Sequence, residues 1–254
     1  MSRVLDQAFD HPSQPEEHAS ALLAGGIMQH GYQCGMIWGA TLAAGAQAFR
    51  LFGPGPQTEV RAILAANRLV ESFRTQNRHI NCHEITNLDK SSSTMQMISF
   101  FLTKGGIISC MRMAGRYARL ALGEINAALP QEPTEAPSSE VSCAAMLARK
   151  MGMSDRHAVM LAGFAGGIGL CGGGCGALGA AIWINALNRC QEPGVKVGFN
   201  DPQSLAAIER FLKSTDYKFE CSEIVGRKFE SIDDHAAHLR NGGCSEIIEV
   251  LAEV

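Results

Sequence analysis

The chain contains nine cysteines among its 254 residues, yet it lacks any Cys-x-x-Cys pair. This absence excludes the thioredoxin-type redox motif, the zinc ribbon, the ferredoxin-type cluster run and c-type haem attachment, all of which use that spacing. The chain also lacks a Walker phosphate loop and a Gly-x-Ser-x-Gly nucleophile elbow. The chemistry of the cysteines has to be sought in another pattern.

A strong charge of either sign is also missing, because the formal net charge is −3 and the pI is about 6.2. This balance gives no reason to expect a nucleic acid as a partner. Residues 1–17 carry several acidic side chains and no apolar core, so they do not resemble a signal peptide. We therefore expect a cytoplasmic protein in a reducing compartment, where disulfides are disfavoured and metal or redox roles for cysteine gain weight.

Two uncharged runs are long enough to cross a bilayer, namely 30 residues over 158–187 and 19 residues over 31–49. The longer run holds nine glycines. Three of them, Gly172 to Gly174, would break a helix at its centre and leave backbone groups without hydrogen bonds in lipid. We therefore expect a helix, a glycine loop and a second helix inside a protein that does not cross the membrane.

The chain repeats itself at an offset of 141 residues. Residues 24–40 match residues 165–181 without a gap, with 8 identities in 17 positions. Cys82-x-Glu-Ile returns as Cys221-x-Glu-Ile, and the Gly-Gly pair ahead of Cys110 returns directly ahead of Cys244. A tandem duplication that keeps cysteines at matching positions in both copies predicts two cysteine sites related by a pseudo-two-fold axis.

Helical patterns dominate, and alternating β-branched runs are nearly absent. We predict an all-α protein made of two pseudo-symmetric helical-bundle repeats packed together, with about five helices in each half. The predicted boundaries are 14–129 for the first repeat, 130–140 for a proline-rich acidic linker, and 141–254 for the second repeat. The expected helices cover 19–29, 34–52, 59–75, 95–102, 107–128, 142–151, 158–164, 175–188, 202–213 and 245–254.

Cys34 and Cys175 stand where a glycine-rich loop turns into a helix. Free N–H groups and the helix dipole favour an anion there, so we expect these thiols to lose their protons easily. Glycines let a backbone pass close to a cofactor. The candidate cofactor-binding residues are therefore Gly31, Gly172, Gly173 and Gly174. The alternative is that the glycines permit close helix packing and the cysteines fill small gaps.

Further ligand candidates follow from the repeat. His30 falls opposite Cys171 at the gapless offset, and both residue types can bind metals. The candidate metal ligands are Cys34, Cys82, Cys110, Cys171, Cys175, Cys221, Cys244 and His30. We expect a cysteine of the glycine loops to lie within ligand range of one from the Cys-x-Glu-Ile segments, and we treat Cys190 as structural.

In these residues the chain resembles the redox-active proteins named for their cysteine pattern, the C_GCAxxG_C_C family. In this comparison Cys143 is the first cysteine, and residues 167–172 form the glycine element with Ile168 where the family has cysteine. Cys175 and its Gly-Ala-x-Gly continuation follow, and then Cys221. The resemblance covers about residues 140–250 well and 18–115 faintly. It implies a helical redox or metal-binding protein and names no substrate.

Three functions remain open from the sequence. The first is a redox protein that binds an iron–sulfur cluster, or zinc or another metal, through cysteine thiolates and exchanges electrons with an unidentified donor or acceptor. The second is a metal-free thiol oxidoreductase, in which Cys175 attacks and Cys171 or Cys221 resolves the disulfide. The third is a non-enzymatic scaffold held by zinc or buried thiols. Whether the protein is an enzyme or forms homo-oligomers is left open.

Overall fold

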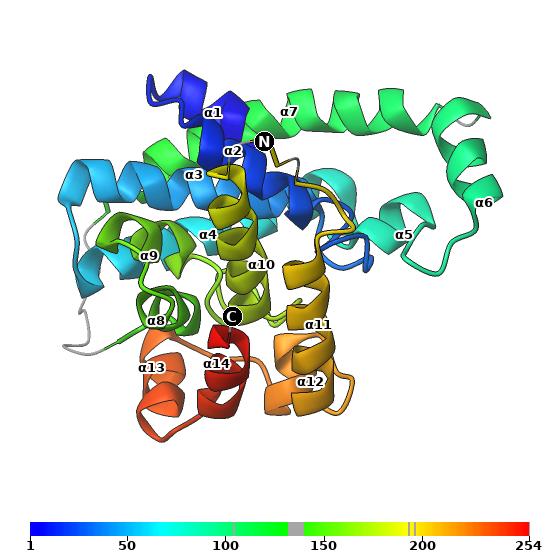
Figure 1. Ribbon diagram of the computed structural model, residues 1–254. Helices are drawn as coiled ribbons and strands as arrows, with labels where there is room; N and C mark the ends of the chain where they lie inside the picture. The colour runs from blue at the N-terminus through cyan, green and yellow to red at the C-terminus, as the bar shows by residue number, and fades with distance from the viewer. Residues whose placement is uncertain (104, 132–139, 193, 196, 254) are drawn as a thin grey trace.

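The computed structural model describes residues 1–103, 105–131, 140–192, 194–195 and 197–253. Over these residues the regular structure is helical, with two isolated β-bridges and no strand. The first half, in the upper part of Figure 1, contains α1 (Ser2–Ala8), α2 (Gln14–Ala19), the 3-10 helix η1 (Ser20–Leu23), α3 (Gly35–Phe52), α4 (Pro56–Asn77), α5 (Cys82–Thr86), α6 (Thr94–Ile98), the π-helical turn η2 (Ser99–Thr103) and α7 (Gly106–Ala128). The second half contains α8 (Cys143–Lys150), α9 (Asp155–Ala162), α10 (Gly176–Cys190), α11 (Pro202–Ser214), α12 (Cys221–Val225), α13 (Ile232–Arg240) and α14 (Ser245–Ala252).

The two halves share one backbone plan, which confirms the predicted all-α fold of two tandem repeats. Helices α1 and α8 begin at positions 141 residues apart, and so do α3 and α10. The loop before α3 has positive φ at Gly25, Gly26 and Gly31, and the loop before α10 has it at the three glycines 141 residues later. One isolated bridge joins Gln33 to Asn81 and the other joins Gly174 to Glu220. The duplication therefore extends to the conformation of individual residues.

Equivalent positions of the two halves touch each other, as a pseudo-two-fold axis requires. The Gln33 amide accepts a hydrogen bond from the backbone N–H of its counterpart Gly174 at 2.7 Å. Glu16 meets its counterpart His157 at 3.0 Å. A Cβ added to Gly179 would lie 2.4 Å from the ring of its counterpart Trp38, so the small residue makes room for the large one. The contacts between helices are reciprocal as well, because α3 packs on α9 while α10 packs on α2 and η1.

Helices α3 and α10 form the centre of the core. Trp38 and Trp183 are fully buried on them, and their indole N–H groups donate to the backbone carbonyls of Gln33 at 3.1 Å and Glu16 at 3.3 Å. Burying two aromatic residues of this size contributes several kcal/mol, on the order of 2–3 kcal/mol each. This central packing fixes the N-terminal ends of α3 and α10, each of which is preceded by a cysteine.

The start of α11 follows the sequence prediction closely. Asp201 caps the helix by accepting a hydrogen bond from the backbone N–H of Ser204 at 2.8 Å, and Pro202 occupies the first turn. Helix α8 is capped in the same way by Ser142, which accepts from the N–H of Ala145 at 3.2 Å.

Several expectations about individual helices are wrong. The helix predicted over 19–29 ends at Leu23, because the chain then enters the loop of positive φ angles that starts at Gly25. The described residues contain seven α-helices in each half rather than about five, since helices such as α5 and α12 are too short to show a periodic pattern. Residues 132–139 of the predicted linker lie outside the described residues. No helix in the described part of the chain is both long and apolar enough for a membrane crossing.

The ion pair at Glu16 yields a prediction about pH. Its carboxylate accepts hydrogen bonds from His157 and from Arg156, the latter at 3.1 Å. Burial opposes ionisation of Glu16, but the bonds from His157, Arg156 and Ser13 prevail and lower its pKa to about 2. An acid whose pKa is lowered on folding stabilises the fold above its unfolded pKa and loses that contribution as the pH falls through the folded pKa. We expect the melting temperature of Glu16→Gln to lie below that of the wild type near pH 6 and the two to converge between about pH 4.5 and 2, measured by circular dichroism.

The matched control is Glu209→Gln, which removes a carboxylate from the exposed pair of Glu209 with Lys213. This variant should melt close to the wild type at every pH. A deficit for Glu16→Gln that stays constant down to pH 2 would contradict the ionic contribution of Glu16.

Candidate thiol sites

The second repeat places a cysteine at the N-terminal end of each of four helices. Cys143 is the first residue of α8, and Cys221 is the first residue of α12. Cys175 is the residue before α10, and Cys244 is the residue before α14. Because α8, α10 and α14 contact one another, these helices bring their starting residues into one region, in the lower half of Figure 1. We call these four cysteines the second-repeat thiol set.

The bridge between the glycine loop and the segment before α12 holds two members of this set side by side. The N–H of Cys175 donates to the carbonyl of Phe219 at 2.9 Å, and the N–H of Cys221 donates to the carbonyl of Gly173 at 2.6 Å. Ser222 adds a backbone bond to Gly172 at 3.0 Å. This geometry agrees with the expected pairing of a glycine-loop cysteine with one from a Cys-x-Glu-Ile segment.

Three of the four thiols are buried, Cys244 is partly exposed, and all four influence one another. Cys143, Cys175 and Cys221 are only 4–7 % exposed. Burial and, to a smaller extent, the neighbouring Cys143 together raise the pKa of Cys175 to about 12. Burial also raises the pKa of Cys221 and of Cys244. Repulsion from the thiolates of other members of the set raises both pKa values as well. Every pair within the set interacts in this way, which shows that the four sulfurs share one region.

The expected easy deprotonation of Cys34 and Cys175 is therefore wrong for the free thiols. Backbone N–H groups do lower the pKa of each, from Met36 for Cys34 and from Ala177 and Leu178 for Cys175. Burial is the larger effect, and it raises both pKa values to about 12.

The first repeat builds the same frame with three cysteines. Cys34 precedes α3, Cys82 begins α5, and Cys110 lies in the first turns of α7. The N–H of Cys34 donates to the carbonyl of Ile80 at 2.7 Å, and the N–H of Cys82 donates to that of Tyr32 at 2.7 Å. These bonds repeat those of Cys175 and Cys221.

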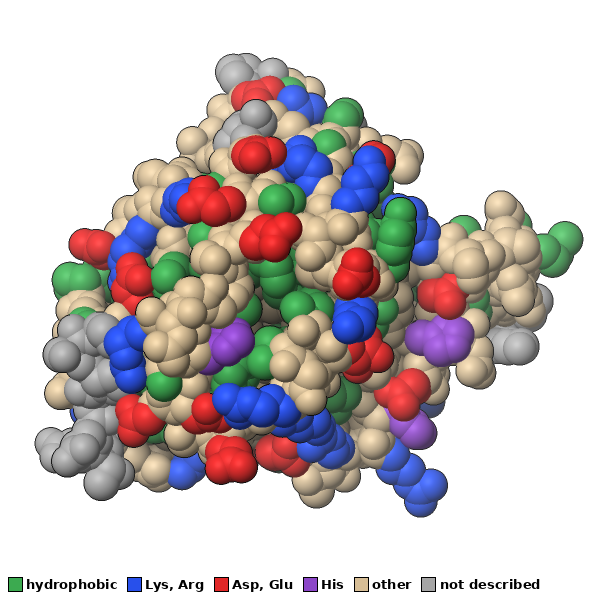
Figure 2. Space-filling model, turned by 90° about the horizontal axis from the view of Figure 1, so that it is seen from below, with side chains coloured by type: hydrophobic (Ala, Val, Ile, Leu, Met, Phe, Trp, Pro, Cys, Tyr) green, Lys and Arg blue, Asp and Glu red, His purple; other side chains and the backbone are tan. Residues whose placement is uncertain are grey.

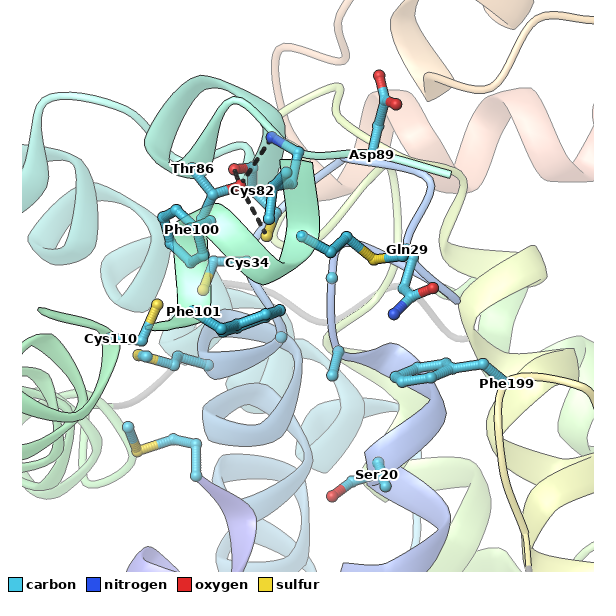
Figure 3. A pocket seen from close by; sticks show the side chains of 18 of the residues that line it. Ser20, Gln29, Cys34, Cys82, Thr86, Asp89, Phe100, Phe101, Cys110 and Phe199 are labelled. Carbon is cyan, nitrogen blue, oxygen red and sulfur yellow. Dashed lines mark hydrogen bonds between the residues drawn. The ribbon is translucent and has the colours of Figure 1, made fainter. Parts of the chain in front are cut away.

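The three thiols of the first repeat line one cavity of about 550 Å³ (Figure 3). Ser2, the first residue of α1, also lines it and occupies the place that Cys143 has in the second repeat. Cys82 and Cys110 are partly exposed, whereas Cys221 is buried. The first site is therefore open where the second is closed.

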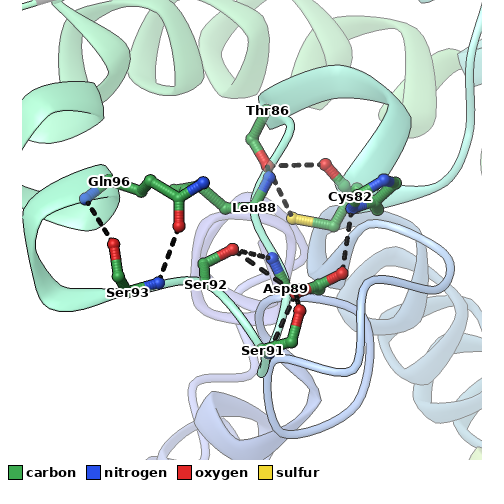
Figure 4. A network of polar contacts seen from close by, with 9 residues as sticks. Cys82, Thr86, Leu88, Asp89, Ser91, Ser92, Ser93 and Gln96 are labelled. Atoms are coloured by element: carbon green, nitrogen blue, oxygen red, sulfur yellow. Dashed lines mark hydrogen bonds and ion pairs between the residues drawn. The ribbon is translucent and has the colours of Figure 1, made fainter.

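The loop that follows Cys82 is held by a polar network (Figure 4). The Thr86 hydroxyl donates to the carbonyl of Cys82 at 2.7 Å and accepts from the N–H of Leu88 at 3.1 Å. Asp89 then accepts from the hydroxyl of Ser91 at 2.6 Å. This network positions the segment that leads from α5 to α6, along one wall of the cavity.

His30 and Cys171 lie between the repeats and are not brought into the thiol sets. The His30 ring stacks on Phe219 at 5.3 Å, and burial lowers its pKa to about 4. The Cys171 sulfur lies 3.6 Å from the Asn67 amide, and burial raises its pKa to about 11. Cys190 ends α10 as a partly exposed thiol.

The four candidate cofactor-binding glycines have backbone roles in the structure. The carbonyls of Gly31 and Gly172 accept hydrogen bonds from the residues that follow Cys82 and Cys221, at 2.9 and 3.0 Å. A Cβ added to Gly173 would lie 1.6 Å from the amide nitrogen of Gln33, and Gly174 donates its N–H to the same side chain. These observations agree with the alternative of close packing, and cofactor binding by the glycines stays a prediction.

The candidate metal ligands do not include two residues that lie at the second site. The family resemblance alone points to Cys143, because the offset of 141 pairs it with Ser2, at an equivalent helix start, rather than with a cysteine. The Cys244 sulfur lies 3.8 Å from Nε2 of His238, and no repeat signal marks this histidine. Among the described residues, no three or more His, Cys, Asp and Glu side chains are arranged to hold a single metal ion.

The family model described as "Putative redox-active protein (C_GCAxxG_C_C)" matches residues 1–122 and 139–254. The chain belongs to this family and contains two tandem copies of it. Neither a curated protein nor a solved structure matches the chain. The pattern in the family's name is met in order by Cys143, residues 174–179, Cys221 and Cys244, with Gly176 in the place of its alanine. The central cysteine of the pattern is therefore Cys175, and not the position of Ile168.

The burial of these thiols predicts their order of alkylation in the metal-free protein. Thiolate is the reactive form, and each unit of pKa changes its fraction tenfold. We expect iodoacetamide at about pH 8 to modify Cys175 at least about tenfold more slowly than Cys190, measured by peptide mass spectrometry. Denatured protein should lose this difference. Equal rates in the folded protein would show that Cys175 is neither buried nor raised in pKa.

Proposed function

We propose that this protein is a redox protein that holds an iron–sulfur cluster on the second-repeat thiol set. The observation that supports the proposal is the meeting of Cys143, Cys175, Cys221 and Cys244 at four helix N-termini. Four thiolates are the usual ligands of [2Fe–2S] and [4Fe–4S] clusters. When bound, such a cluster supplies one-electron transfer.

The number of thiols suits a cluster, which can take one cysteine on each of several irons. The four thiols raise one another's pKa, and no group among the described residues is arranged around a single metal ion. Cysteines that bind different irons of a cluster stand farther apart than four ligands of one tetrahedral ion. The zinc alternative needs the tighter arrangement, with every sulfur at about 2.3 Å from the same ion.

The surroundings of the set also suit a negatively charged group. Backbone N–H groups of Gly166 and Ala144 point to the Cys143 sulfur, and those of Ala177 and Leu178 point to the Cys175 sulfur. Hydrogen bonds to sulfur and exclusion of water are the means by which a protein sets the potential of a cluster. The same burial that makes free thiolates costly would be offset by the positive charge of iron.

The metal-free oxidoreductase alternative finds less support. A reactive cysteine needs a lowered pKa and an accessible sulfur. Cys175, the predicted attacking thiol, is 6 % exposed and has a pKa of about 12. Cys171, one predicted resolving thiol, lies beside Asn67 of the other repeat.

Metal loading tests the proposal. After anaerobic purification, we expect iron and acid-labile sulfide in the wild type and the loss of most of both in Cys175→Ser and Cys143→Ser. Cys171→Ser and Cys190→Ser are the matched controls, because their sulfurs lie outside the set, and both should keep their iron. Circular dichroism confirms folding in each variant. Zinc without sulfide, or equal loss in the controls, would contradict the cluster.

The duplication offers a reciprocal test at Ser2. Because Ser2 occupies the helix start that Cys143 occupies in the second repeat, Ser2→Cys completes a four-thiol set with Cys34, Cys82 and Cys110. We expect this variant to bind more iron per chain than the wild type after anaerobic reconstitution with iron and sulfide. Ser72→Cys, which adds a thiol on α4 away from this cavity, is the control and should show no gain. An unchanged iron content in Ser2→Cys would show that four thiols on this frame are not enough for a site.

A further inference from the structure

The cavity of the first repeat is not explained by metal binding in the second. Ser2 lines it in the place of a fourth thiol, and Cys82 and Cys110 are partly exposed. We propose that this cavity is a binding site for a neutral, mainly apolar aromatic molecule, which lies against the three thiols of the first repeat.

The size and walls of the cavity carry this assignment. Its volume of about 550 Å³ is within the range of sites that enclose small organic ligands. Aromatic rings stand on two sides, with Phe100 and Phe101 beside the thiols and Phe199 across from them (Figure 3). Ring faces and edges of this kind recognise a flat aromatic partner.

The wall beside the thiols is preformed. Phe100 and Phe101 contact each other edge to face, with ring centroids 5.1 Å apart. A Cβ added to Gly106 would lie 2.3 Å from the Phe100 ring, so this glycine lets the ring pack on the start of α7. The turn η2 is thereby fixed against the helix that carries Cys110. A site that is formed before the ligand arrives loses less entropy on binding.

The charges at the cavity favour a neutral occupant. Glu17 is 5 % exposed and pairs with Arg3 at 3.8 Å. Asp89 pairs with His83 at 3.2 Å and accepts from Ser91. A ligand anion would meet two carboxylates and one guanidinium, that of Arg3, which is already paired with Glu17, in an apolar surrounding that penalises charge. Gln29, on the side away from the thiols in Figure 3, supplies an amide that can bind one polar group of the ligand.

The second repeat shows why the two sites differ. There Cys143 takes the place of Ser2, and α14, which follows Cys244, packs against α8, α10 and α11. In the first repeat α6 and η2 stand in the segment before α7 and line the cavity with Met97 and Phe101. One copy therefore carries four thiols, three of them buried, and the other carries three thiols that line a pocket.

Two probes of the same shape test the charge preference. N-phenyl-1-naphthylamine is neutral and aromatic, and 8-anilinonaphthalene-1-sulfonate is a close relative that carries a negative charge. We expect the neutral probe to bind the full-length protein with a rise in fluorescence, and the anionic probe to bind about tenfold more weakly or less. Equal affinity for the two probes would overturn the neutral-ligand assignment.

Alkylation locates the binding. The neutral probe should slow the reaction of iodoacetamide with Cys82 and Cys110 and leave Cys190 unchanged, measured by peptide mass spectrometry. Binding to the exposed apolar residues of α6 and α7, such as Met95 and Ile108, would raise fluorescence without this protection. That result would overturn the proposal.

Variants complete the test. Phe101→Ala should lower the affinity for the neutral probe about tenfold, because an aromatic contact with the cavity wall is lost. Phe52→Ala is the matched control, since both phenylalanines are 43 % exposed and Phe52 does not line the cavity. Phe199→Ala, on a loop across from the thiols, provides a second variant if Phe101→Ala fails to fold. Equal effects of all three variants would contradict the assignment.

The assay needs no metal, so its outcome is independent of the iron content that tests the proposed function.

Discussion

The thiol sites depend on two isolated antiparallel bridges, Gln33 with Asn81 and Gly174 with Glu220. Each bridge joins segments that are more than 45 residues apart, and each is followed directly by the two cysteines that it brings together. The entropy of closing such a loop grows only slowly with its length, so a few backbone bonds supported by packed helices are enough. Without the bridges, the cysteine before the central helix and the cysteine that begins the short helix would have no fixed relation.

Gln33 connects these bridges across the pseudo-two-fold axis. Its fully buried amide donates to the carbonyl of Gly167 at 3.2 Å and accepts from the N–H of Gly174. A glutamine at one position and a glycine at its counterpart break the symmetry, because even a Cβ on Gly174 would lie 3.0 Å from Oε1 of Gln33 and leave little room for a second glutamine. The interface is therefore complementary rather than identical, which allowed the two copies to diverge while they remained packed together.

The sequence was enough to predict the all-α class, the duplication and the approach of the Cys175 and Cys221 segments, because these follow from spacing and from matched residues. The repeat alone did not mark Cys143, since its counterpart is Ser2, and the prediction for the pKa of Cys34 and Cys175 was wrong. Local sequence shows the free N–H groups of a helix start, but burial is set by the packing of distant helices and outweighs them. His238 could not be predicted, because its contact with Cys244 arises from the local turn between α13 and α14.

The contrast between the sites follows from the energetics of buried sulfur. A neutral thiol packs as a small apolar group, so the second-repeat set is stable while it stays protonated. Its four thiolates would repel one another, and a bound cation would offset that repulsion. Under the proposed function, loss of protons and gain of metal would therefore be coupled at this site. In the first repeat, three thiols and Ser2 face a cavity instead, so apolar contact can favour binding there without ionisation of any sulfur. The two copies differ at Ser2 and Cys143 and in the segment before α7, and under the two proposals their sites have different requirements for charge.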